Sequence, residues 1–365
     1  MKDRILAINP GSTSTKIAVY EDKTCILRES IAHTKGDLEQ FHDLYEQIPF
    51  RLQIICAHMA KFGIAQESLS AAVGRGGLIA PVASGTYRVD DAMILDLKHS
   101  ERMHASNLGA LLAWRIASEM DKPAFIVDPV TVDERDPKAR ISGLKGVERT
   151  SVFHALNQKA VARKTADLLH KRYEELNLVV AHLGGGFSVG AHQHGRVIDA
   201  SNALEGEGPF SPDRSGAVPI LRLLEFLHHN HIESQAEIQR LLLNAGGFVS
   251  YFGTNDLLLL QKREDEGDQY VADILDAYVY QVAKEIGAYA AVLKGDMDAV
   301  VLTGGIAHSQ RIITAVQAYI SFLGPVYVWP GEDEMEALAL GALRVMQGEE
   351  EAKHYATEKR KMMQT

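Results

Sequence analysis

The sequence contains few cysteines, no long apolar run and no surplus of basic residues. Only Cys25 and Cys56 occur among its 365 residues, too few for a disulfide framework and without the spacing of a metal site. No apolar run reaches the roughly 20 residues that cross a bilayer. The net charge of −10 argues against nucleic acid or an anionic membrane as a partner. It leaves room for a small anionic ligand held by local arginines.

The N-terminus lacks the features of a signal peptide, because Asp3 and the turn at Asn9-Pro10-Gly11 interrupt it. A cytoplasmic protein is therefore expected. The composition, 46% hydrophobic and 24% charged, is that of an ordinary globular protein. Its length exceeds that of a typical single core and predicts two domains. We place them at residues 1–150, joined by a C-terminal helix at 338–365, and at residues 151–337.

Three glycine-containing turns organise the chain. The first, in "ILAINPGSTSTKIAVY" (Ile5–Tyr20), lacks the second glycine of a P-loop and is followed by a β-favouring segment, which predicts a hairpin. A similar strand–turn–strand pattern recurs at Leu178–Asp199, half a chain later, and suggests an internal duplication. The third turn, in Asp298–Ile312, joins a buried strand to a helix.

Helical patterns fill the spaces between these turns and predict an α/β fold. The clearest run over Ser106–Met120, Ser151–Tyr173 and Gln269–Leu293. The charged tail from Gly348 is expected to form a solvated terminal helix. Each glycine turn could present backbone N–H groups to a phosphate, although a single such turn could equally be a solvated loop. A nucleotide held between the two hairpins, with its adenosine near the third turn, fits all three.

The ordered set "INPGSTSTK", "AHLGGGFSVGA" and "VVLTGGIA" resembles the phosphate and adenosine motifs of the acetate and sugar kinase/Hsp70/actin superfamily. Within it, "VGRGGLI", "RMHASNLGA", "EGEGPFSPDRSGAVP" and "VSYFGTND" resemble the acetokinase family, most closely its butyrate kinase branch. The resemblance implies an α/β, two-domain actin-like ATPase fold, made of duplicated ribonuclease H-like domains with an interdomain cleft. It also implies ATP and Mg²⁺ as cofactors and a homo-oligomer, a dimer or larger.

Site residues can be carried over where the motifs match. The resemblance implies catalytic roles for Asn9, Arg75, Asp128, His154 and Arg214. It implies Asn9 and Glu334 as the metal-linked residues, with Glu332 and Glu336 as alternatives to Glu334. Nucleotide contacts are expected from Gly11, Ser12, Ser14, Lys16, His182, Gly184, Gly185, Gly186, Ser188, Asp256, Gly304 and Gly305.

The expected chemistry is transfer of a phosphoryl group from ATP to a short-chain carboxylate, giving an acyl phosphate. A carboxylic acid is already ionised at pH 7, so catalysis is mainly positioning and charge stabilisation. We assign Arg75 mainly to the carboxylate and Arg214 mainly to the phosphoryl group, with His154 hydrogen-bonded to the latter. Asp128 could position Arg214 or bind Mg²⁺ through water.

The residues after Arg75 bear on the size of the acid. Acetate kinases typically carry two valines there, whereas this chain has Gly76 and Gly77, which predicts room for butyrate or a branched analogue. Met103 and Phe153 are the expected apolar walls of this pocket. The glycines could instead serve backbone geometry alone.

Two other functions remain open from the sequence. A sugar or alcohol kinase of the same superfamily would use Asp128 as a general base. A nucleotide-gated binding protein of the chaperone or actin kind would hydrolyse ATP slowly and bind a protein partner.

Overall fold

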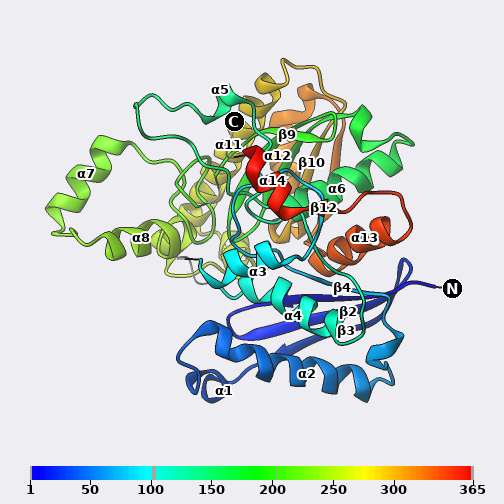
Figure 1. Cartoon of the computed structure of the whole chain (residues 1–365). Coiled ribbons are helices and arrows are strands. Elements are labelled where there is room, and N and C mark those ends of the chain that lie inside the picture. The colour runs from blue at the N-terminus through cyan, green and yellow to red at the C-terminus, as the bar shows by residue number, and fades with distance from the viewer. Residues whose placement is uncertain (1, 101–103, 203, 363–365) are drawn as a thin grey trace. The chain divides into compact units, whose positions relative to one another are not determined.

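The computed structural model describes residues 2–100, 104–202 and 204–362 and divides the chain into two compact units (Figure 1). The first unit comprises Met1–Asp133 with Asp333–Thr365, and the second comprises Glu134–Glu332. These limits differ from the sequence-based ones at residues 150 and 337. None of the described helices is both long and apolar enough to cross a bilayer.

The first unit is built on a seven-stranded sheet with the order β12-β5-β6-β4-β1-β2-β3. Strands β1, β2 and β3 form an antiparallel meander, and β4 and β6 continue the sheet parallel to β1. Its strands are β1 (Arg4–Pro10), β2 (Ser14–Glu21), β3 (Thr24–Ala32), β4 (Ala71–Gly74), β5 (Thr86–Arg88), β6 (Ala124–Val127) and β12 (Lys353–His354). Its helices are α1 (Lys35–Glu39), α2 (Ile48–Lys61), α3 (Asp91–Lys98), α4 (Asn107–Ser118), α13 (Glu334–Met346) and α14 (Tyr355–Met362).

The second unit is built on a five-stranded sheet with the order β11-β10-β7-β8-β9. Strands β7, β8 and β9 are antiparallel, and β10 and β11 run parallel to β7. Its strands are β7 (Asn177–Leu183), β8 (Phe187–Gln193), β9 (Arg196–Ala200), β10 (Ala299–Gly304) and β11 (Val326–Pro330). Its helices are α5 (Pro137–Arg140), α6 (Ala155–Leu168), α7 (Ile220–His229), α8 (Gln235–Asn244), α9 (Gly247–Phe252), α10 (Leu257–Asp265), α11 (Gln269–Val292) and α12 (Gln310–Ile320).

The two sheets share one topology. The order β6-β4-β1-β2-β3 in the first unit matches β11-β10-β7-β8-β9 in the second, strand for strand and direction for direction. Each begins with a three-stranded meander whose first turn contains glycine. The internal duplication inferred from the two hairpins is confirmed.

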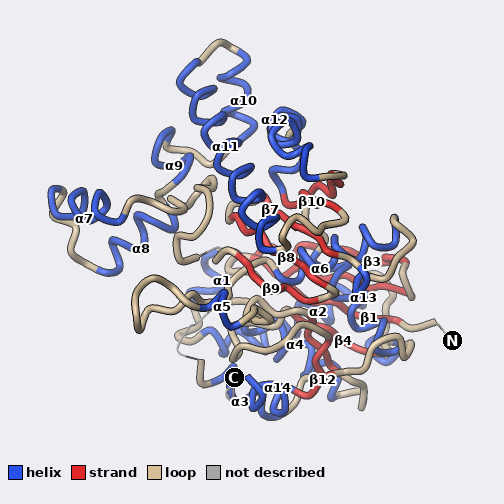
Figure 2. The backbone as a smooth tube through the Cα atoms, turned by 90° about the horizontal axis from the view of Figure 1, so that it is seen from above, coloured by secondary structure: helices blue, strands red, loops and turns tan. Residues whose placement is uncertain are grey.

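Both faces of the central strands are covered, which explains why these strands read as continuous apolar runs. In β7, Val179 and Ala181 join the core with α11, while Leu178 and Val180 pack on the opposite face with α6. In Figure 2, α11 runs beside β7 and β8, which it contacts. In the first unit, α4 packs on β4, β6 and β1, and α13 also packs on β1, β4 and β6.

The C-terminal segment differs from the solvated helix that its charge predicted. From Gly348 onward, the charged tail forms the short strand β12 beside β5 and then α14. Tyr355 is fully buried at the start of α14, and its hydroxyl donates to Asp96 (2.6 Å) and accepts from the backbone N–H of Ala80 (3.0 Å). The tail is therefore an integral part of the first unit, anchored by residues far away in the sequence.

Candidate active site

In the first unit, three residues expected at the site come together. Asn9 lies at the end of β1, and Arg75 follows β4, with its backbone N–H bonded to Ile8 O (3.0 Å). Glu334 begins α13, and its carboxylate accepts hydrogen bonds from Asn9 Nδ2 and Arg75 Nη1. The side chains of Arg75 and Glu334 are only 29% and 18% exposed, so solvent screens this ion pair weakly.

The geometry separates the three acids that compete for the metal-linked position. The backbone N–H of Glu336 is capped by Asp333 (3.0 Å) within the first turn of α13. Glu332 belongs to the second unit, where its carboxylate lies 3.9 Å from His182 Nε2. The carboxylate of Glu334 contacts both Asn9 and Arg75.

A buried arginine that the sequence analysis missed supports the first turn. Arg51 of α2 donates to the carbonyl oxygens of Gly11 (3.0 Å) and Ser14 (3.1 Å), to Thr15 Oγ1 (2.8 Å) and to Gln47. These acceptors are all neutral. Burial lowers the pKa of Arg51, but a guanidinium remains charged in proteins. The signal available in the sequence was its position four residues before Ile55, on the apolar face of α2.

The two glycines after Arg75 have a packing explanation. A Cβ on Gly76 would lie 2.7 Å from Pro129 Cβ, and one on Gly77 would lie 2.7 Å from Asn107 Cα, with φ at +68°. Their small size therefore permits close packing, and the inference that they make room for a longer acid loses its basis. Met103 lies outside the described residues. Phe153 is buried in the second unit, and its place in a substrate pocket remains a prediction.

Asp128 follows β6 as Arg75 follows β4, and because these strands are adjacent and parallel, both residues lie at the same sheet edge. Asp128 is buried and adopts a φ of +38°, which is uncommon for a residue other than glycine. Its carboxylate accepts the N–H of Gly85 (2.8 Å), and its own N–H donates to Gly85 O (3.1 Å). Backbone strain of this kind concentrates at functional sites.

In the second unit, Arg214 lies against the Gly184–Gly186 turn between β7 and β8. A Cβ on Gly186 would sit 2.9 Å from Arg214 Cζ and closer still to Nη1, so only glycine leaves space for the guanidinium. The hydroxyl of Ser211 donates to Gly185 O, which ties the arginine's loop to the turn. Burial lowers the pKa of Arg214, and the neighbouring Asp213 opposes this shift.

Hydrogen bonds from α9 and the residues on either side of it hold the loop that carries Arg214. The backbone N–H groups of Gly246 and Val249 donate to Asp213 O and Pro212 O, both at 3.0 Å. Asn255 Nδ2 donates to the Asp213 carboxylate (2.7 Å). The "YFGTND" motif therefore supports the "SPDRSG" motif. Asp256, expected at the nucleotide, caps α10 by accepting the N–H groups of Leu258 (3.0 Å) and Leu259 (3.2 Å), and its nucleotide contact remains a prediction.

His154 precedes α6 and lies beside the same hairpin. Its ring stacks on that of His182, with centroids 3.7 Å apart and planes 9° apart, and its Nδ1 is 2.8 Å from Ser188 Oγ. His182 lies one residue before the end of β7 and is hydrogen-bonded to Asn157 (3.0 Å). Residues expected to contact the phosphoryl group and the nucleotide thus share one surface of the second unit.

The third turn closes this edge of the second sheet. Gly304 has a φ of +91°, and a Cβ there would lie 2.7 Å from Leu183 C. Gly304 and Gly331 exchange backbone hydrogen bonds of 3.1 and 2.9 Å. A Cβ added at Gly305 would meet no atom within 4 Å. The ends of β7, β10 and β11 thus meet at one sheet edge, the usual ligand site of such folds.

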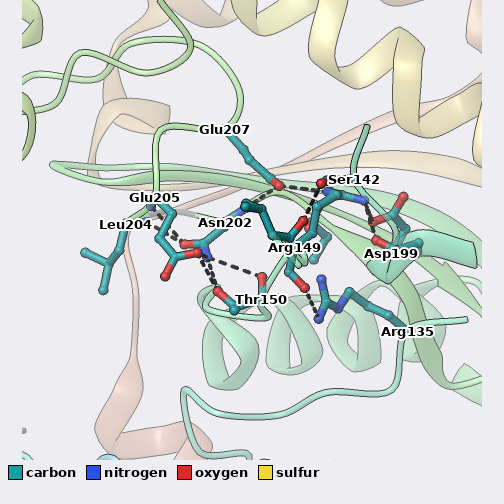
Figure 3. Close-up of polar contacts among 12 residues, drawn as sticks. Arg135, Ser142, Arg149, Thr150, Asp199, Asn202, Leu204, Glu205 and Glu207 are labelled. Carbon is teal, nitrogen blue, oxygen red and sulfur yellow. Dashed lines mark hydrogen bonds and ion pairs between the residues drawn. The ribbon is translucent and has the colours of Figure 1, made fainter. Parts of the chain in front are cut away.

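A charged cluster in the second unit was also missed (Figure 3). Arg149 donates to both carboxylate oxygens of Glu207 (2.7 and 2.9 Å) and to Asp199 (3.0 Å). Asn202 Nδ2 donates to Thr150 Oγ1 (2.8 Å) and Glu205 (3.0 Å). This cluster anchors the start of the loop that leads to Arg214. Its signal in the sequence was one arginine and a few scattered acids, and such charged residues are usually just solvated.

The donor set fits a magnesium ion carried by a nucleotide better than a resident metal. Among the described residues, no three His, Cys, Asp or Glu side chains form a metal-binding group. Mg²⁺ usually keeps several waters and binds one or two carboxylates together with phosphates. A carboxylate can accept about four hydrogen bonds, so Glu334 retains capacity for a metal-bound water beside Asn9 and Arg75.

Comparison with known proteins identifies the fold. The chain matches the crystal structure of Porphyromonas gingivalis acetate kinase with a TM-score of 0.78 and 20% identity, covering 94% of this chain and 100% of that one. It matches a propionate kinase from Francisella tularensis subsp. tularensis SCHU S4 with a TM-score of 0.72 and 19% identity, covering 93% and 98%. It matches the structure of acetate kinase from Entamoeba histolytica with a TM-score of 0.72 and 15% identity, covering 92% of this chain and 98% of that one. The expected two-domain actin-like ATPase fold is confirmed.

A family model also matches the sequence itself. The match is to the acetokinase family and spans residues 143–333, more than half of the chain. This segment contains His154, the Gly184–Gly186 turn, Arg214 and the Gly304-Gly305 turn. The expectation drawn from these motifs is confirmed at the level of the family: this chain belongs to the acetokinase family.

Proposed function

We propose that the protein transfers the terminal phosphoryl group of ATP to a short-chain carboxylate, producing ADP and an acyl phosphate. A carboxylate oxygen forms the new bond to phosphorus while the bond from phosphorus to the ADP oxygen breaks. The observation that carries the proposal is the placement of Arg214 against the Gly184–Gly186 turn, with His154 beside the same hairpin. A guanidinium and an imidazole next to a phosphate-type turn suit the stabilisation of a transferring phosphoryl group.

The residues of the first unit suit the second substrate. Arg75 provides a guanidinium for the carboxylate, and Glu334, itself bonded by Asn9, holds that guanidinium in place. Glu334 and Asn9 also provide oxygen ligands for waters of the metal, which would neutralise charge on the nucleotide phosphates when bound. Asp128 is assigned a positioning role for these residues at the sheet edge. Because the acid is already ionised, no general base is required.

Within this class, we propose butyrate or a branched analogue as the acid. This rests on the motif resemblance, since packing explains Gly76 and Gly77. The similar structures named above are those of an acetate kinase and a propionate kinase, so acetate and propionate are the natural competitors. We further propose a cytoplasmic homo-oligomer that binds neither nucleic acid nor membrane.

An acyl-hydroxamate assay tests this function. Hydroxylamine traps an acyl phosphate as a coloured iron complex when protein, ATP and Mg²⁺ are supplied with acetate, propionate, butyrate, isobutyrate, glucose or glycerol. We expect colour with the acids, strongest with butyrate or isobutyrate, and ADP release that requires an acid. ADP formation with glucose or glycerol, without hydroxamate from any acid, would contradict the proposal and favour a sugar or alcohol kinase.

A further inference from the structure

A chain of hydrogen bonds leads from His154 into the interior of the second unit. His154 Nδ1 lies 2.8 Å from Ser188 Oγ, which lies 2.9 Å from Gln158 Nε2. Gln158 Oε1 lies 3.0 Å from His192 Nε2, and His192 Nδ1 lies 2.7 Å from the hydroxyl of Tyr173. Ser188, Gln158 and His192 are fully buried, so their partners are these protein groups.

Gln158 sets the direction of this chain. Its Nε2 also lies 3.2 Å from the backbone oxygen of Ser188, which can only accept a hydrogen bond. The amide NH₂ group therefore faces Ser188, and the amide oxygen faces His192. It follows that Nε2 of His192 carries a proton and donates it to Gln158.

The charge of His192 agrees with this assignment. Burial and the nearby Lys159 lower the pKa of His192 to about 3, so the ring is neutral at pH 7, although Glu134 acts in the opposite direction. With its proton on Nε2, the ring accepts the Tyr173 hydroxyl at Nδ1. The orientation of Gln158 does not depend on this step, because the carbonyl of Ser188 alone determines it.

Ser188 transmits the direction to His154. Its Oγ accepts a hydrogen bond from Gln158 Nε2 (2.9 Å) and lies 3.4 Å from the backbone N–H of His154, which is also a donor. The remaining neighbour at hydrogen-bond distance is His154 Nδ1. The Ser188 hydroxyl must therefore donate its proton to His154 Nδ1, and a neutral His154 carries its own proton on Nε2.

We propose that Ser188 and Gln158 are positioning residues that hold His154 in the tautomer protonated at Nε2. The catalytic role of this tautomer rests on the proposed function. In that role, Nε2–H donates a hydrogen bond to the transferring phosphoryl group, and His154 does not act as a base. The sequence predicted a nucleotide contact for Ser188. Its hydroxyl is instead fully buried and engaged by His154 and Gln158.

The tautomers can be read directly by NMR. The full-length chain is labelled with ¹⁵N-histidine, and long-range ¹H–¹⁵N correlation spectra are recorded near pH 8, with His154→Gln and His192→Gln used for assignment. We expect both rings to be neutral and protonated at Nε2. A wild-type His154 protonated at Nδ1, or at both nitrogens, would overturn the proposal.

Variants then test the relay, by which we mean the hydrogen-bond chain from Gln158 through Ser188 to His154. In Ser188→Ala, His154 loses the donor to Nδ1 and should become a mixture of tautomers, whereas Ser188→Thr keeps the hydroxyl and should keep the tautomer. Gln158→Glu offers a carboxylate in place of the NH₂ group, so the Ser188 hydroxyl should donate to this carboxylate instead of to His154. His154 should then become protonated at Nδ1 and donate to Ser188 Oγ. Tyr173→Phe is the matched control, because the orientation of Gln158 survives it. An unchanged His154 tautomer in both Ser188→Ala and Gln158→Glu would overturn the proposal.

Kinetics give a second readout. Loss of the fixed hydrogen bond should lower kcat about tenfold in Ser188→Ala and leave KM for ATP within about twofold, with recovery in Ser188→Thr. A Ser188→Ala protein with normal kcat would show that the relay does not contribute to catalysis. The spectra need no substrate, so a wild-type protein that makes no acyl phosphate would refute the proposed function and leave the tautomer result standing.

Discussion

The contact between Gly186 and Arg214 offers a single-atom test of the phosphoryl site. In Gly186→Ala, the new Cβ would lie 2.9 Å from Arg214 Cζ, whereas carbon atoms prefer separations of about 3.5–4.0 Å. The backbone at Gly186 does not adopt a positive φ, so alanine fits there without strain. Because the obstacle is the end of a flexible side chain, the guanidinium should move by about 1 Å while the fold survives. A displacement of this size in a catalytic group costs about 10²-fold in rate.

Steady-state hydroxamate kinetics measure the effect. We expect kcat to fall about 100-fold with a thermal midpoint close to wild type. Gly185→Ala is the control in the same turn, since its Cβ would meet only the tip of Asp213 at 3.1 Å, and it should stay within about threefold of wild type. In an Arg214→Ala background, itself expected to lose about 10²–10³-fold in kcat, Gly186→Ala should cost nothing further. Equal effects of the two glycine variants, or full additivity with Arg214→Ala, would refute the reasoning.

Three further predictions follow from the other contacts. Burial, reinforced by Glu207, raises the pKa of Glu285 from 4.5 to about 7, so the folded state binds this proton more tightly and stability should fall as pH rises from 4.5 to 7. The free energy of unfolding of Glu285→Gln, relative to that of wild type, should therefore be about 3 kcal/mol higher at pH 8 than at pH 4.5, as read from urea midpoints. The same difference between the two proteins at both pH values would contradict this. Arg51→Met removes the guanidinium that donates to Gly11 O, Ser14 O and the buried Thr15 hydroxyl under the first turn and should lower the thermal midpoint by about 4–8 °C, so an unchanged midpoint would argue against that support. Arg75→Lys loses the planar fork and should raise KM for the acid at least about tenfold while leaving KM for ATP nearly unchanged; the reverse pattern would reassign Arg75 to the nucleotide.

The sequence was sufficient for the parts of the fold that local patterns determine. The hairpins of β1–β2 and β7–β8 follow from apolar strands separated by glycine turns, and they appear where expected. The helices at Asn107–Ser118, Ala155–Leu168 and Gln269–Val292 follow from apolar spacing. Because both hairpins carry the same signal, the duplication could be inferred before any strand order was known.

Contacts between residues distant in the sequence could not be predicted in this way. The burial of Tyr355 depends on Asp96 and Ala80, more than 250 residues away, so a charged tail gave no sign of it. The contact of Glu334 with Asn9 depends on how α13 meets the end of β1. In the sequence, Gly76 and Gly77 suggest open space, and only the position of their neighbours reveals a packing role.

In the reaction that we propose, a carboxylate oxygen attacks the terminal phosphorus of ATP. The most direct measurement supplies butyrate labelled with ¹⁸O in both carboxylate oxygens and follows the product by ³¹P NMR. We expect an acyl phosphate signal shifted by one ¹⁸O bonded to phosphorus, together with an equal amount of ADP. ADP accompanied only by unlabelled inorganic phosphate, with no labelled acyl phosphate at any time, would contradict it.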